Sequence, residues 1–76
     1  MLGDELYRRR VAAGLTQEEL ADRAEIDRTY VSKLERGIQS PTVDMLIRVC
    51  HAMGAKASDV LAAVEGDHRI AQRKRR

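Results

Sequence analysis

The chain has 76 residues, 43% of them hydrophobic and only 3% aromatic, which excludes global disorder and predicts one small domain with an aliphatic core. The formal net charge is +2, and basic residues gathered at 66–76 leave the rest close to neutral, so bulk charge alone does not indicate nucleic-acid binding. A single cysteine, Cys50, excludes an intrachain disulfide, and without a secretory signal or a membrane-length apolar run we expect a cytoplasmic protein.

The first predicted helix covers residues 2–13. Gly14 ends it, because glycine readily adopts the left-handed conformation common after helices. The second helix begins at Thr16, where Glu19 three residues later completes a capping box. Leucines before and after this cap form the matching hydrophobic staple.

The third and fourth helices repeat these signals. Asp27 is the predicted N-cap of the third helix, which ends at Gly37. Thr42 caps a fourth helix at 43–53, and Gly54 ends it. Apolar residues recur at helical spacing in this fourth segment, so we expect it to pack one face against the core.

A short fifth helix is expected at about 57–64. No strand pattern is present, so the sequence predicts an all-α fold, a compact five-helix domain at 1–65. The basic segment 66–76 is predicted to be a disordered tail, with a nonspecific DNA clamp as the alternative.

The third helix has two different faces when its residues are placed 100° apart. Val31 and Leu34 lie on one side, with Glu35 near them, and this side is expected to pack inward. The opposite side carries Thr29, Lys33 and Arg36, flanked by Arg28, Tyr30 and Ser32. These side chains offer guanidinium, ammonium, hydroxyl and methyl groups, which read base edges in the major groove. On wheel position alone, an ordinary solvated face is an equal alternative.

The stretch LTQEELADRAEIDRTYVSKLERG, residues 15–37, resembles the helix-turn-helix of the lambda-repressor-like (XRE or Cro-type) family. The resemblance extends over residues 2–64 and includes GLTQEELA, YVSKLERG, SPT and LIRVCHAMG at the family's spacing. The version DRTYVSKLERG is especially similar to the controller proteins of restriction–modification systems. The resemblance implies a sequence-specific transcriptional regulator that reads double-stranded DNA with the helix at 28–36.

The resemblance also implies roles for individual residues. Base-reading positions are Arg28, Thr29, Ser32 and Lys33, with Tyr30 at the edge of the groove. Phosphate contacts fall to Gln17, Arg36, Gln39 and the backbone amides after Gly37. Arg10 is placed beneath the third helix, where it would form an internal ion pair with Glu35.

Two positions depart from the family's pattern. Glu25 stands at the tight turn where glycine is usual, so we expect a glutamate at positive φ, which costs roughly 1 kcal/mol. Ile38 stands where a basic residue is common, which removes one expected phosphate contact.

Assembly as a homodimer on a two-fold operator is expected, because one such domain makes few contacts alone. Leu61 is predicted to enter the core, which leaves Val60 or Val64 for a self-complementary patch. The alternative function is an antitoxin-like protein-interaction module with secondary DNA binding, and the positive charges of the third helix favour DNA.

Catalysis, a metal and a cofactor are not expected. The chain has no nucleophile–base pair, no glycine-rich phosphate loop and no histidine or cysteine pair at ligand spacing. Cys50 is predicted to be a buried, inert thiol. The adjacent acids Asp4–Glu5 and Glu18–Glu19 are predicted to be solvated acids of first helical turns.

Overall fold

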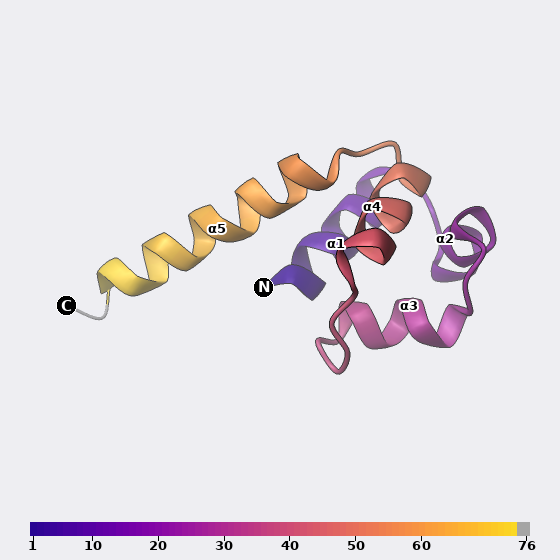
Figure 1. Ribbon diagram of the computed structural model, residues 1–76, viewed down its shortest axis with the longest axis horizontal. Coiled ribbons are helices and arrows are strands. Elements are labelled where there is room, and N and C mark those ends of the chain that lie inside the picture. The colour runs from indigo at the N-terminus through magenta and orange to yellow at the C-terminus, as the bar shows by residue number, and fades with distance from the viewer. Residues whose placement is uncertain (75–76) are drawn as a thin grey trace.

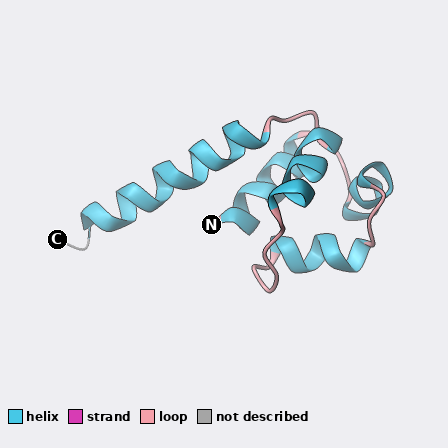
Figure 2. Cartoon of the chain, viewed as in Figure 1, coloured by secondary structure: helices cyan, strands magenta, loops and turns pink. Residues whose placement is uncertain are grey.

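The computed structural model describes the backbone of residues 1–74 and the side-chain surroundings of residues 1–66. In this part of the chain the regular structure is entirely helical, as the sequence predicts (Figure 2). The five helices are α1 (Leu2–Ala12), α2 (Gln17–Ala24), α3 (Arg28–Glu35), α4 (Val43–Ala52) and α5 (Ala57–Lys74). None of the described helices has both the length and the apolar character needed to cross a bilayer.

The predicted N-caps are confirmed. The Thr16 hydroxyl accepts the Glu19 amide at 3.0 Å, and the Glu19 carboxylate accepts the Thr16 amide at 2.9 Å. The Asp27 carboxylate accepts the Thr29 amide at 2.7 Å, and the hydroxyl of Thr42 caps α4 in the same way. These backbone hydrogen bonds hold the pKa values of Glu19 and Asp27 below their ordinary values. Local sequence therefore sets where α2, α3 and α4 begin.

Positive φ angles mark the turns between helices. Gly14, Gly37 and Gly54 have φ of 74°, 73° and 72°, as expected for residues that end helices. Glu25 has φ of 58° and is the one non-glycine residue with positive φ in the described chain. The expected strained turn between α2 and α3 is therefore present.

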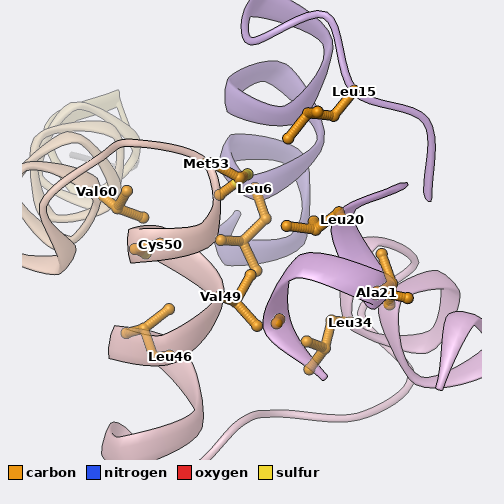
Figure 3. Close-up of a cluster of buried hydrophobic side chains, with 12 residues drawn as sticks. Leu6, Leu15, Leu20, Ala21, Leu34, Leu46, Val49, Cys50, Met53 and Val60 are labelled. Carbon is orange, nitrogen blue, oxygen red and sulfur yellow. The ribbon is translucent and has the colours of Figure 1, made fainter. Parts of the chain in front are cut away.

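The core lies where the first four helices and the start of α5 meet. Figure 3 shows Leu6 of α1 between Leu20 of α2 and Val49 of α4, and all three side chains are almost fully buried. Cys50 is also fully buried, and burial raises the pKa of its thiol. This environment agrees with the expected inert cysteine.

The predicted end of the fifth helix at Val64 is wrong, because α5 continues to Lys74. The residues after Val64 contain no proline, and Gly66 is their only strong helix-weakening residue, so nothing local stops the helix. Figure 1 shows the second half of α5 running away from the other four helices. Residues 66–74, expected in a disordered tail, are thus helical, while 75–76 lie outside the described residues.

The predicted orientation of α5 is also wrong. Val60 is fully buried, whereas Leu61 is 41% exposed and Val64 is half-buried. Because α5 packs against α1 and α4 through the face that carries Val60, the next residue is turned about 100° towards solvent. The expected core position of Leu61 is therefore taken by Val60.

Glu5 differs from its predicted solvated state, since only 11% of its side chain is exposed. Its carboxylate lies 2.8 Å from Arg9 Nε and 3.3 Å from an Arg8 nitrogen on the same helix. The two arginines compensate the buried charge, which first-turn position alone did not indicate.

Candidate nucleic-acid interface

The outer face of α3 carries four of the five residues predicted to read bases, all except Tyr30. Arg28 and Thr29 in the first turn are exposed, and Ser32 and Lys33 are partly exposed one turn later. Tyr30 is half-buried and packs against the core, which leaves only part of its ring accessible. The structure thus brings the five predicted base-reading positions onto one short helix.

The inner face of α3 is held by apolar packing. Val31 and Leu34 are 1% and 3% exposed, and they pack in the same cluster as Ala21 and Ala24 of α2. The small alanine side chains let the two helices approach closely. Packing of this kind fixes which side of α3 can face a partner.

The expected ion pair between Arg10 and Glu35 is present. Arg10 Nε lies 2.6 Å from Glu35 Oε2, and Arg10 Nη2 lies 3.0 Å from Oε1, so the contact is bidentate. The two side chains are only 11% and 5% exposed. Hydrogen bonding to Glu35 raises the pKa of Arg10, which also donates from Nη1 to the Leu15 carbonyl. The pair therefore connects α1, the following loop and α3.

Gln17 belongs to the same cluster, which sequence reasoning missed. Its Nε2 donates to Glu35 Oε1 at 3.0 Å, and the side chain is partly buried. The expected phosphate contact of Gln17 would have to use the remaining amide groups. The position of Gln17 could have indicated this bond. Gln17 is the first residue of α2 and directly follows the loop to which Arg10 also binds.

The loop amides after α3 are less available for phosphate than expected. The amide of Gly37 donates to the Leu34 carbonyl at 3.2 Å, and the amides of Ile38 and Gln39 donate to the Lys33 carbonyl at 3.0 and 3.4 Å. These bonds close the C-terminal end of α3. The remaining predicted phosphate residues, Arg36 and Gln39, have exposed side chains.

Gly3 is a further residue of the junction that sequence reasoning missed. A Cβ atom at Gly3 would lie 2.5 Å from the Glu35 carbonyl oxygen and 2.6 Å from that of Leu34. No side chain fits there, so the start of α1 rests directly on the last turn of α3. This close approach orients α1 so that Arg10 reaches Glu35.

Comparisons with known proteins agree with this arrangement. The transcriptional regulator ClgR of Mycobacterium tuberculosis is 32% identical over 75 residues, which is 99% of this chain but 65% of ClgR. The ClgR structure from Corynebacterium glutamicum has a TM-score of 0.87 and 35% identity, covering 97% of this chain and 79% of that one.

Two further solved structures share the fold. The restriction–modification controller protein C.AhdI from Aeromonas hydrophila has a TM-score of 0.75 and 30% identity, covering 78% of this chain and 89% of that one. The biofilm regulator SinR, solved in complex with DNA, has a TM-score of 0.75 and 27% identity, covering 80% and 98%. Residues 6–60 match the family described as Helix-turn-helix. Since that match takes in more than half of the chain, the protein belongs to the helix-turn-helix family, whose members named above are regulators.

Proposed function

We propose that this protein regulates transcription by binding a specific double-stranded DNA site, with α3 in the major groove. The observation that carries the proposal is the contrast between the two faces of α3. Its inner face is buried and bound through Leu34 and Glu35, while its outer face exposes Arg28 and Thr29 in the first turn. A rigid helix with exposed donors and a methyl group suits base recognition. The SinR relative was solved with DNA, which supports the same class of partner.

The proposed mechanism separates positioning from reading. Arg36 and Gln39 follow the last turn of α3 and would contact phosphates, which fix the register of the helix without reading sequence. Arg28 would donate both guanidinium branches to guanine O6 and N7, and the Thr29 methyl group would contact thymine. The apolar packing and the Arg10–Glu35 pair behind α3 would hold these side chains at fixed positions relative to the bases.

Selection of duplexes from a random pool at stated salt tests this function. Arg28→Ala and Lys33→Ala should each lose about 1–3 kcal/mol of binding free energy on the selected duplex and relax the choice at one or two base pairs. Arg48→Ala is the matched control, because it removes an exposed arginine from α4. If Arg28→Ala weakened selected and random DNA equally, base reading by Arg28 would be excluded. A pool without enrichment would favour the protein-interaction alternative.

We further propose that the protein binds its operator as a homodimer through the exposed side of α5. Val60 is buried and excluded from this role, whereas Leu61 is 41% exposed and Val64 is half-buried one turn later. Leu61→Asp should shift sedimentation towards monomer and lower operator affinity although Arg28 is intact. Val11→Asp on α1 is the control, since Val11 is an exposed apolar residue of another helix. A normal Leu61→Asp dimer would place the interface elsewhere.

The basic C-terminal segment is proposed to add nonspecific affinity for DNA. Deleting the residues after Asp67 removes five positive charges that could displace counterions from the duplex. Affinity for all sequences should fall alike, and its dependence on salt concentration should become weaker. A deletion that changed base preference instead would contradict this role.

A further inference from the structure

The Glu35 carboxylate is bound from two neighbouring helices at once. Oε1 accepts hydrogen bonds from Arg10 of α1 and from Gln17 of α2, both at 3.0 Å, and Oε2 accepts a second bond from Arg10 at 2.6 Å. Among the described residues, every buried side-chain nitrogen and oxygen atom has a hydrogen-bond partner. The last residue of α3 is therefore fixed to both helices that pack beside it.

Gln17 supplies a directional contact between α2 and α3. The two helices also meet in the apolar cluster, to which α2 contributes Leu20, Ala21 and Ala24. Apolar packing fixes which face of α3 turns inward, and a hydrogen bond of set length and angle adds a directional restraint at one point along the two helices. Gln17 is the first residue of α2 and Glu35 is the last residue of α3, so their bond joins the N-terminal end of α2 to the C-terminal end of α3.

We propose that Gln17 is a positioning residue for base reading. Its bond to Glu35 sets the position of α3 relative to α2. This position determines which bases Arg28 and Thr29 can contact. Any phosphate contact made by Gln17 would use amide groups that do not take part in the bond to Glu35. This inference rests on the proposed function as a DNA-binding regulator.

The two possible roles of Gln17 have different consequences. A residue that only contacts phosphate contributes equally on every DNA sequence, so its loss leaves discrimination unchanged. A residue that positions α3 affects affinity for the right sequence more than for the wrong one. It also stabilises the protein without DNA, because the bond to Glu35 is present in the free protein.

The experiment compares Gln17→Met with Gln39→Met in the full chain. Methionine keeps the length of the side chain and removes its donors, and Gln39 is an exposed glutamine also expected near phosphate. Urea unfolding without DNA measures the folding equilibrium constant. Competition binding uses the duplex selected from the random pool and the same duplex with one base pair changed in each half-site.

Gln17→Met should lower the folding equilibrium constant about tenfold, since it removes a hydrogen bond to a charged group. It should also reduce discrimination between the two duplexes by about threefold or more. Gln39→Met should change the folding constant less than about twofold and weaken both duplexes equally. An unchanged folding constant with equal weakening of both duplexes by Gln17→Met would overturn the proposal.

Gln17→Glu is a second, independent variant. It removes the donor and places a carboxylate against Glu35, so its folding equilibrium constant should fall further than that of Gln17→Met. Wild-type stability in Gln17→Glu would also overturn the proposal. If the wild type selected no duplex at all, the proposed function itself would fail, and the unfolding measurements would then assign Gln17 a purely structural role.

Discussion

Two arginines of α1 form ion pairs that differ in reach. Arg10 pairs with Glu35, 25 residues away on α3, and both side chains are nearly buried. Arg9 pairs with Glu5 one turn earlier on α1, and a third of its side chain is exposed.

The junction of α1, α2 and α3 differs from α5 in a similar way. The junction of α1, α2 and α3 is joined by directional bonds and a direct backbone contact at Gly3, whereas Val60 is the only fully buried side chain described for α5. The helix proposed to read DNA is tied to its neighbours by directional bonds, whereas α5 is held near its start by the apolar packing of the buried Val60 and the partly buried Ala57.

The largest expected effect concerns the two arginines. Arg10→Ala should lower the free energy of unfolding by about 3–5 kcal/mol, because it strands the buried charge of Glu35. Arg9→Ala should lower it by about 1 kcal/mol or less, because the pair is local and Arg8 still lies 3.3 Å from Glu5. Urea melts of both variants measure the difference, and equal small losses would contradict the assigned importance of the junction.

The two helical glycines give the next largest contrast. Gly3→Ala should destabilise the protein by about 1–3 kcal/mol, because the added Cβ meets the backbone oxygens of Leu34 and Glu35. Gly66→Ala should stabilise it by about 0.5–1 kcal/mol, since the position is helical with nothing within 4 Å of the new atom. Thermal melts measure whether each substitution lowers or raises the melting temperature. A stabilising Gly3→Ala would mean that α1 can move away from α3 without loss.

The turn between α2 and α3 should respond to changes at Glu25. Its φ of 58° costs an L-residue roughly 1 kcal/mol, which Glu25→Gly removes while adding freedom to the unfolded chain. Glu25→Gly should therefore be neutral or stabilising by up to about 1 kcal/mol. Glu25→Val should be less stable than either, because a β-branched side chain tolerates positive φ poorly. Chemical denaturation of the three proteins tests this order, and a Val variant equal to the wild type would contradict it.

The smallest expected effect is a pH dependence at the start of α3. The hydrogen bond from the Thr29 amide lowers the pKa of Asp27 from its ordinary value of 3.8. The unfolded chain therefore takes up this proton first, so the stability from ionised Asp27 is present above 3.8 and is lost as the pH falls through the folded-state pKa. Asp27→Asn caps without titrating. Its deficit in melting temperature against the wild type should shrink on acidification, and a constant deficit would exclude Asp27 as the titrating group.

Residue types close together in the chain are sufficient to predict where most of the helices start and end. Thr16, Asp27 and Thr42 bond to amides two or three residues away, and Gly14 and Gly37 relieve a strain within their own backbone. These interactions depend on neighbours in the chain, so their residue types are sufficient to predict them. The resemblance to a known family added the pair between Arg10 and Glu35, which spacing alone does not show.

Other features depend on residues that are distant in the chain and follow only from how the helices pack. Gln17 could donate to phosphate or to Glu35, and only the packing of α2 on α3 brings Glu35 Oε1 within 3.0 Å. Val60 and Leu61 are adjacent apolar residues, and the surface that α1 and α4 present to α5 decided which one is buried. The order of these two residues in the chain does not predict which one is buried, because burial depends on how far the helix is rotated about its axis when it packs.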